Sequence, residues 1–336
     1  MEKFVVILAA GRGSRMQSRN PDHSKVAYPI LDKPIINYVI DAVKGIHPNK
    51  IVTVVGFGGE VTTELVKNDS EVVWQKVING TGKAVLQAEP ILKDKPGLTL
   101  VVYGDTPLIT PETIHNVFRI HEKTGNSLTV VSMFLEKPRG YGRIIREYKT
   151  NQLIDIREDR DCSEEEISIN EVNAGMCVID NELLFKYLDR VTPNNAQHEY
   201  YLSSLVKMFH EDGLKVGAYI VEDAKEMFGV NDRVQLAYAA KTIKKRVNQK
   251  LMFNGVSIED PNTAYISPDV EIGKDTVIRP NTTISGKCKI GENNIIGPNV
   301  YIKDSVIGSD NIILSSWIDH GEIGSGQKVY DFKKFE

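Results

Sequence analysis

The sequence is poor in cysteine and tryptophan, and it lacks any apolar run long enough to cross a membrane. Its three cysteines, Cys162, Cys177 and Cys288, show no C-x-x-C spacing. The lack of this spacing and the odd number of cysteines argue against a zinc site or a disulfide framework. We therefore expect buried or incidental thiols.

An excess of charge of one sign is also lacking. The formal net charge is -4, with acidic and basic residues well mixed. The charge therefore indicates no nucleic-acid and no membrane partner, and a small molecule is the expected ligand. The apolar stretch at residues 4–10 follows a single lysine and has no clear cleavage motif, so it is not read as a signal peptide. We expect a soluble, cytoplasmic protein.

The length of 336 residues exceeds what one core usually supports, so two domains are expected. In the first, residues 1–228, apolar strands alternate with amphipathic helices, which predicts an α/β sheet with helices on both faces. Ligands of such sheets bind at the carboxyl ends of the strands. Strands are expected at 4–8, 51–55, 72–74, 99–103, 128–134 and 176–179, and helices at 35–45, 59–67, 82–92 and 111–123.

Residues 229–253 are predicted to form a linker helix, because the segment from Asn231 to Phe253 has no proline or glycine and is rich in helix formers. In the last domain, residues 254–336, isoleucine recurs every six residues. Compact residues stand two positions before each of these isoleucines. This hexapeptide pattern is typical of a parallel β-helix. The isoleucines are Ile266, Ile272, Ile278, Ile284, Ile290, Ile296 and Ile302, and the compact residues are Ala264, Val270, Thr276, Thr282, Cys288, Asn294 and Val300.

The repeat slips after Ile302 and resumes at Ile307, Ile313, Ile318 and Ile323. About three coils are expected before the polar end of the sequence. Cys288 is predicted to be a spacer of the repeat and His320 a surface residue. Coils that stack only on their neighbours need capping, so this domain indicates either a truncated stack or self-association.

The motif ILAAGRGSRM, residues 7–16, joins a buried strand to a glycine-rich loop with two cations nearby. Ala9, Ala10, Gly11 and Gly13 leave little side-chain bulk, so backbone N–H groups can approach phosphate oxygens closely. Arg15 and Lys25 add positive charge there. The alternative is an ordinary tight turn, because the motif lacks both the G-x-G-x-x-G and the G-K-[ST] patterns.

Three further motifs carry polar groups. In VVYGDTPLI, a strand delivers Asp105 to the sheet edge, where a carboxylate can hold magnesium beside phosphates, unless Asp105 is only a turn residue. Gln75 and the Gly80-Thr81-Gly82 turn can receive a planar base, or form a generic helix start. GYGR with Gly142, then Glu158 and Asn173, can bind sugar hydroxyls or an acetamido group, although spacing alone does not bring them together.

Together with NNAQHEYY and GVNDR, these motifs occur in the order found in the bacterial N-acetylglucosamine-1-phosphate uridyltransferases. The chain resembles that family from Val5 to about Ile323. The resemblance implies an α/β nucleotidyltransferase domain with a Rossmann-like mixed sheet, followed by a C-terminal left-handed parallel β-helix. It also implies a homotrimer.

For the active site, the resemblance implies UTP and N-acetylglucosamine 1-phosphate as substrates and Mg²⁺ as cofactor. Arg15 and Lys25 would be catalytic, and Asp105 and Asn231 would hold the metal. The expected product is UDP-N-acetylglucosamine, formed by in-line attack on the α-phosphorus with release of pyrophosphate. The nucleotide would contact Leu8, Ala9, Ala10, Gly11, Gly13, Gln75, Gly80, Thr81, Tyr103 and Gly104, and the sugar would contact Gly142, Glu158, Asn173 and Asn231.

The chain departs from the family at three places: a longer loop between Arg15 and Lys25, Tyr28 in place of a histidine-containing sequence, and His198 where glycine is common. The first two are expected to affect how Lys25 reaches the phosphates, and the third to crowd the sugar pocket. Full-length bifunctional members also continue into an acetyltransferase site, which is not expected in this chain.

Two alternatives to this activity stay open. One is the same chemistry with another sugar 1-phosphate or with dTTP, which the changes at Tyr28 and His198 keep possible. The other is an inactive regulatory protein that binds nucleotide sugars. Against it stands the presence of Arg15, Lys25, Asp105 and Asn231 together, because binding alone would not require the metal pair.

Overall fold

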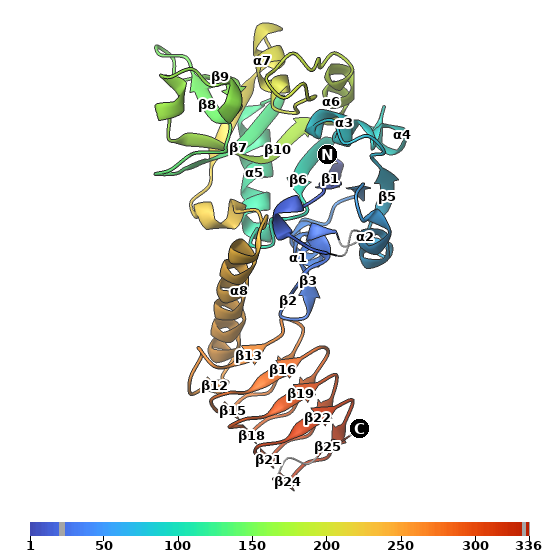
Figure 1. Ribbon diagram of the computed structural model, residues 1–336, viewed down its shortest axis with the longest axis vertical. Coiled ribbons are helices and arrows are strands. Elements are labelled where there is room, and N and C mark those ends of the chain that lie inside the picture. The colour runs from blue at the N-terminus through green and yellow to red at the C-terminus, as the bar shows by residue number, and fades with distance from the viewer. Residues whose placement is uncertain (20–23, 331–333, 336) are drawn as a thin grey trace. The chain divides into compact units, whose positions relative to one another are not determined.

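The computed structural model describes residues 1–19, 24–330 and 334–335. The chain divides into two compact units (Figure 1). The first unit comprises residues 1–28 and 34–233, and the second comprises residues 29–33 and 234–336. Among the described residues, no helix combines the length and the apolar character that a bilayer crossing requires.

A mixed sheet forms the centre of the first unit. Its main path within the described residues runs β11-β7-β10-β6-β1-β4-β5, and β8 and β9 extend it beside β10. All pairs along the path are parallel except those of β10, which runs antiparallel to β6 and β7. The strands are β1 (Lys3–Ala9), β4 (Lys50–Val55), β5 (Glu71–Trp74), β6 (Leu98–Tyr103), β7 (Leu128–Phe134), β8 (Arg143–Arg146), β9 (Leu153–Arg157), β10 (Glu171–Asp180) and β11 (Val216–Ile220).

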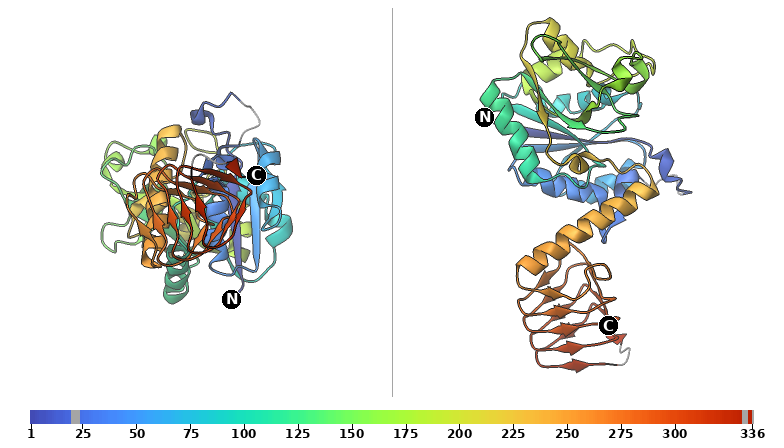
Figure 2. Two further views of the ribbon diagram at one scale, coloured as in Figure 1. Left: turned by 90° about the horizontal axis from the view of Figure 1, so that it is seen from below. Right: turned by 90° about the vertical axis from the view of Figure 1, so that its left-hand side faces the viewer.

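Helices cover both faces of this sheet, as the alternation predicted (Figure 2). Alternate residues of β1 enter two cores: Val6 packs with α3, α6 and α7, and Ile7 packs with α1, α2 and α5. Burial on both faces explains why this strand is continuously apolar. The helices are α1 (Ile35–Lys44), α2 (Gly59–Val66), α3 (Thr81–Leu86), α4 (Glu89–Leu92), α5 (Pro111–Thr124), α6 (Asn181–Leu188) and α7 (Ser204–Glu211).

The short elements of the first 230 residues, apart from the undescribed residues 20–23, are one hairpin and the 3₁₀ turns η1 to η5. The hairpin pairs β2 (Pro29–Ile30) with β3 (Lys33–Pro34). The turns are η1 (Ser14–Met16), η2 (Lys25–Ala27), η3 (Asp159–Asp161), η4 (Glu166–Ser168) and η5 (Ala224–Met227). Several of these turns carry residues of the site described below. The predicted helix at 82–92 is wrong in one respect, because α3 ends at Leu86 and α4 begins at Glu89.

The second unit includes α8 (Arg233–Phe253) from Val234 onward, so a helix is present in the segment predicted at 229–253, although it begins at Arg233. The strands that follow stack as rungs in three parallel sheets (Figure 1). One sheet contains β12 (Ser257–Ile258), β15 (Val277–Ile278), β18 (Ile295–Ile296), β21 (Ile312–Ile313) and β24 (Lys328–Val329). The next contains β13 (Tyr265–Ile266), β16 (Thr283–Ser285), β19 (Tyr301–Lys303), β22 (Trp317–Asp319) and β25 (Lys334–Phe335). The third contains β14 (Glu271–Ile272), β17 (Lys289–Ile290), β20 (Val306–Ile307) and β23 (Glu322–Ile323).

The isoleucine ladder explains this stacking. Ile266, Ile284, Ile302 and Ile318 lie in one register, and each is fully buried. The compact residues of the repeat are buried as well, including Cys288. The β-helix is therefore confirmed. The expectation of about three coils was too low, because two of the three sheets contain five strands each within the described residues.

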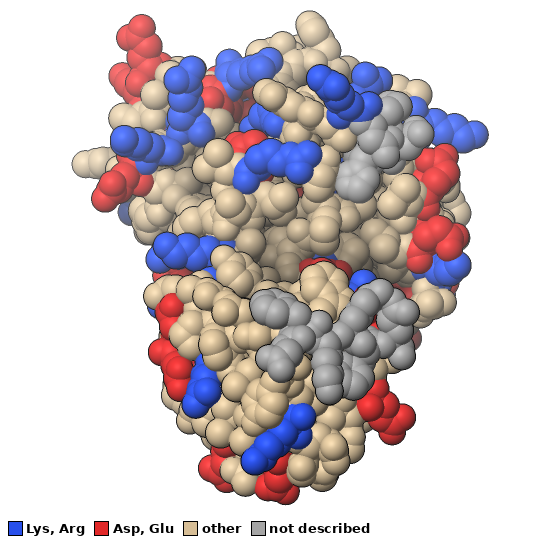
Figure 3. Space-filling view, turned by 60° about the horizontal axis from the view of Figure 1, so that its bottom comes forward, with Lys and Arg blue, Asp and Glu red and all other residues tan. Residues whose placement is uncertain are grey.

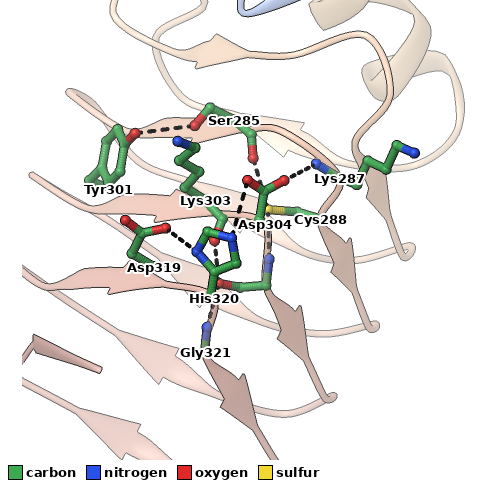
Figure 4. Close-up of polar contacts among 10 residues, drawn as sticks. Ser285, Lys287, Cys288, Tyr301, Lys303, Asp304, Asp319, His320 and Gly321 are labelled. Atoms are coloured by element: carbon green, nitrogen blue, oxygen red, sulfur yellow. Dashed lines mark hydrogen bonds and ion pairs between the residues drawn. The ribbon is translucent and has the colours of Figure 1, made fainter. Parts of the chain in front are cut away.

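The slip in the repeat falls at a corner of the β-helix, where the backbone turns through left-handed conformations at Asp304 and His320. Asn and Asp tolerate this conformation better than most residues, which explains their recurrence at such corners. His320 is exposed, as predicted, and its ring contacts Asp319 and Asp304 (Figure 4). The Asp304 carboxylate accepts a hydrogen bond of 2.9 Å from the backbone N–H of Lys287, which stabilises the neighbouring coil.

Candidate active site

An outer cavity of about 320 Å³ lies where β1, β5 and β6 end. These strands are parallel members of one sheet, so their carboxyl ends meet at the same edge. Most of the predicted nucleotide and metal residues, and the predicted catalytic Lys25, line this cavity. They are Leu8, Ala9, Ala10, Gly11, Lys25, Gln75, Gly80, Thr81, Tyr103, Asp105 and Asn231.

Lys25 is the centre of the polar contacts in the outer cavity. Its ammonium group donates a hydrogen bond of 2.9 Å to Asn231 Oδ1 and forms an ion pair with the Asp105 carboxylate. The Lys25 and Asp105 side chains are only 13% and 15% exposed. Two oxygens from distant parts of the chain therefore converge on one cation.

The oxygens of Asp105 and Asn231 can be compared with the ligands that a magnesium ion requires. Mg²⁺ prefers oxygen ligands and is usually held by one or two carboxylates together with waters and substrate phosphates. The Asp105 carboxylate and the Asn231 amide oxygen are donors of this kind, and both already bind a cationic group. No cluster of three His, Cys, Asp or Glu side chains in the described part of the chain could hold a metal alone. The pair therefore fits a metal that completes its coordination with phosphate oxygens and water.

The glycine-rich loop packs against Lys25. Gly13 has a left-handed backbone, with φ of 60°, and a Cβ placed there would lie 2.6 Å from Lys25 Cβ. Arg15 follows in η1, where it is exposed. Burial raises the pKa of Tyr141, Asp105 raises it further, and Arg15 acts in the opposite direction. Arg15 thus lies within electrostatic reach of the groups near Asp105, although neither it nor Gly13 lines the outer cavity as described.

Gly80 is required by close packing at the opposite wall. Its φ is 120°, and a Cβ placed there would lie 2.5 Å from the Tyr200 backbone nitrogen. Gly82 N donates to the Tyr200 carbonyl at 2.7 Å, so this turn is fixed to the segment around Tyr200. Gln75 is 4% exposed and donates to the Gly80 carbonyl at 3.2 Å. The wall therefore combines the Gln75 amide with a glycine turn that has no side chain at Gly80.

An inner cavity of about 30 Å³ lies next to the outer one, and Thr81 and Tyr103 line both. Glu158 and Asn173 line the inner cavity. Gly142 is adjacent, because its carbonyl accepts from Asn173 N at 2.8 Å and a Cβ placed on it would lie 3.3 Å from Glu158 Oε2. The structure thus brings together the three residues that sequence spacing alone left apart.

Glu158 is a mostly buried acid at the end of this arrangement. Burial raises its pKa above the ordinary value, the hydrogen bond from Ser203 opposes that rise, and Asp161 and Asp159 add to it. Ser203 Oγ donates to Glu158 Oε1 at 2.7 Å. Sequence reasoning missed Ser203, although it lies two residues beyond the NNAQHEYY motif, in which only His198 was given a role. Gly104, which was assigned to the nucleotide, packs on β1, with its N–H donating to the Leu8 carbonyl at 2.9 Å, and it is not among the residues that line the outer cavity.

The departures from the family have separate structural outcomes. Much of the longer loop, residues 20–23, lies outside the described residues. Tyr28 is buried, and its hydroxyl accepts a hydrogen bond of 3.1 Å from Arg233. His198 has a φ of 54°, which explains why glycine suits this position. Its side chain is exposed and lines neither of the two cavities described above.

Comparison with known proteins agrees with this geometry. Residues 5–141 match the model of a MobA-like NTP transferase domain. Proteins named bifunctional protein GlmU are similar over almost the whole chain: that of Lactobacillus johnsonii is 45% identical over 98% of the chain and 70% of its own length. The chain belongs to the GlmU family. The GlmU protein of Thermoanaerobacter pseudethanolicus is 45% identical over 99% of the chain and 72% of its own length. The GlmU protein of Streptococcus gordonii is 41% identical over 98% of the chain and 71% of its own length.

Membership of the GlmU family establishes the chain as a nucleotidyltransferase with a hexapeptide β-helix. The outer cavity, at the strand ends within the matched NTP transferase region, is thus the candidate nucleotide site.

The three cysteines are free thiols, and Cys177 and Cys288 are buried. On the face shown in Figure 3, basic and acidic side chains are interspersed, in keeping with the small net charge.

Gly13→Ala is predicted to weaken binding of a nucleoside triphosphate. Gly125→Ala is a matched control, because Gly125 has a φ of 63° and nothing lies within 4 Å of a Cβ placed there. Both variants should lose about 1 kcal/mol of stability through the left-handed backbone. Only Gly13→Ala should also displace Lys25. Calorimetric titration with nucleotide separates the two, and equal affinities for both variants would contradict the packing argument.

Glu158→Gln is predicted to raise the stability of the protein at neutral pH. Burial raises the folded-state pKa of Glu158 above the ordinary 4.5. The wild-type fold therefore loses stability as the pH rises from the ordinary pKa to the raised one. Glutamine retains an acceptor for Ser203 without the buried charge. Urea unfolding measured from pH 4 to pH 8 should show the advantage shrinking toward low pH. A gain that does not depend on pH would show that the charge is not its cause.

Proposed function

We propose that this chain transfers the UMP group of UTP to N-acetylglucosamine 1-phosphate, giving UDP-N-acetylglucosamine and pyrophosphate in a magnesium-dependent reaction. The observation that carries the proposal is the convergence of Lys25, Asp105 and Asn231 beside the glycine-rich end of β1. Membership of the GlmU family supports the choice of substrates. Assembly as a homotrimer belongs to the same proposal.

UTP binding is assigned to the outer cavity. The small residues Ala9, Ala10, Gly11 and Gly13 allow the triphosphate to approach the backbone, and Lys25 and Arg15 provide positive charge. The uracil ring would lie against the backbone near Gly80, within reach of the Gln75 amide. Ala84 and Ile78 also line this cavity and supply apolar surface for the ring.

The sugar phosphate is assigned to the inner cavity and the groups around it. The Glu158 carboxylate and the Asn173 side chain can bond to hydroxyl and acetamido groups, and Gly142 leaves space beside them. The volume of about 30 Å³ is smaller than a sugar ring needs, so binding requires the surrounding side chains to move. Because the two cavities share Thr81 and Tyr103, the sugar phosphate would lie next to the α-phosphate.

The chemical step needs no protein nucleophile. An oxygen of the sugar phosphate forms a bond to the α-phosphorus of UTP while the bond from that phosphorus to the bridging oxygen of pyrophosphate breaks. Lys25 and Arg15 offset negative charge on the transferring group and on the leaving pyrophosphate. A magnesium ion held by Asp105 and Asn231 would supply further charge neutralisation. Positioning and electrostatic stabilisation therefore account for the catalysis.

Pyrophosphate release from UTP, measured with a panel of sugar 1-phosphates, tests this function. N-acetylglucosamine 1-phosphate is expected to be preferred over N-acetylgalactosamine 1-phosphate and glucose 1-phosphate, and UTP over dTTP. Preference for another pair would assign the same chemistry to different substrates. Absence of turnover with every pair, despite nucleotide binding, would favour the regulatory alternative.

Asp105→Ala is predicted to lower turnover about a hundredfold or more while the protein stays folded, because it removes a metal ligand and the partner of Lys25. Asp69→Ala is the control: Asp69 forms an ion pair of 2.7 Å with Lys44 outside the cavities, at more exposed side chains. Turnover should be measured over a magnesium titration. Wild-type turnover of the Asp105 variant at equal magnesium would reject the metal assignment.

A further inference from the structure

Arg233 connects three segments of the candidate active site. It is the first residue of α8 and follows Asn231 closely in the sequence. Its guanidinium lies over the Tyr28 ring, 4.5 Å from the ring centre, and Nη2 donates to the Tyr28 hydroxyl at 3.1 Å. Its Nε donates to the Met16 carbonyl at 3.3 Å. One side chain thus bonds to residues that follow η2 and end η1.

Each of the three joined segments carries one polar group of the site. Met16 ends η1, in which Arg15 is the preceding residue, and Tyr28 follows η2, which begins with Lys25. Asn231 lies just before Arg233 and accepts a hydrogen bond from Lys25. The positions of Arg15, Lys25 and Asn231 relative to one another therefore depend in part on the contacts of Arg233.

Residues 11–17, here called the phosphate loop, contact Lys25 at Gly13 but bury few side chains of their own. Met16 is the only buried residue of η1, and the two residues that flank this turn, Gly13 and Gln17, both have left-handed backbones. A bond to the carbonyl of the one buried residue anchors the loop at its best-packed point. The Tyr28 ring and hydroxyl both hold the guanidinium, since arginine can interact with an aromatic ring and also donate hydrogen bonds.

We propose that Tyr28 and Arg233 form a clamp that holds the phosphate loop in register with Lys25 and Asn231, so that both are positioning residues for the triphosphate. The proposal rests on the proposed function for its choice of nucleotide. It also gives a role to the departure at Tyr28: this residue acts on the phosphate site through Arg233 and the Met16 carbonyl, without lining the cavity itself.

Four variants test the clamp. Tyr28→Phe keeps the ring and removes the hydroxyl acceptor, whereas Tyr28→Leu removes both. Arg233→Lys keeps the charge and loses the fork of donors. Lys244→Met is the matched control, because Lys244 lies on the same helix with its ammonium 4.2 Å from the centre of the Tyr265 ring. It removes a cation–aromatic contact that has no connection to η1 or η2.

The expected result is a selective change in the nucleotide step. The KM for UTP should rise about threefold in Tyr28→Phe and about tenfold in Arg233→Lys, since a hydrogen bond to a charged group is worth about that factor or more. The KM for the sugar phosphate and the melting temperature should stay near wild-type values in these variants. The control variant Lys244→Met should show wild-type values throughout. The double variant Tyr28→Phe, Arg233→Lys should be less impaired than the product of the single effects, because both remove the same clamp.

Hydrogen exchange of the amides in residues 11–17, measured without nucleotide, is the readout that does not need turnover. Exchange should be faster in Tyr28→Leu and Arg233→Lys and unchanged in Lys244→Met. Unchanged exchange together with an unchanged UTP affinity would overturn the clamp. A lower melting temperature together with a parallel rise in both KM values would also overturn the clamp, because it would indicate a merely structural role. If the wild type turns over no sugar phosphate, the proposed function fails. The rate of amide hydrogen exchange and the affinity for UTP still decide whether the clamp exists.

Discussion

The candidate site depends on one ammonium group that is shared by two oxygens from distant parts of the chain. Lys25, Asp105 and Asn231 have only partly exposed side chains, and the positive charge of Lys25 is balanced by Asp105. A buried charge needs such a partner, because an uncompensated ion away from water is costly. The same arrangement places charge of both signs where a triphosphate and a metal would need it. The sheet edge, the η2 turn and the start of α8 all contribute to holding these three side chains together.

Sequence patterns predicted the parts of the fold that follow one physical period. The apolar run of β1 and the six-residue isoleucine repeat each state which side chains are buried, and both were confirmed. The patterns were less informative where tertiary contacts decide. Only residues 176–179 of β10 were expected as a strand, but its pairing with β7 and β8 extends it from Glu171 to Asp180. The helices α6 and α7 and the strands β8, β9 and β11 were not predicted from local periodicity at all.

The candidate site shows the same division. Gly13 and Gly80 are visible in the sequence because their backbones require glycine, and the structure gives the reason in the neighbouring Lys25 and Tyr200. Ser203 and Arg233 could not be assigned from sequence alone, because their roles are contacts to Glu158 and to Tyr28 across long separations. A serine or an arginine has no local pattern that states its partner. The motif at residues 194–201 was a usable signal, because His198 within it was expected at the sugar pocket, but the sequence could not show that Ser203 beyond it contacts Glu158.

Tyr103 lies in the wall between the two cavities of the candidate site. It lines both cavities, and burial raises its pKa, with Glu158 and Asp105 raising it further. The phenol therefore stays neutral at any physiological pH and keeps a proton to donate. The wall between the two cavities thus carries no negative charge of its own, while the acids Asp105 and Glu158 lie on either side of it. Under the proposed function, this neutral wall would not repel the phosphates of the two substrates, and the positive groups Lys25 and Arg15 would act on the transferring phosphate.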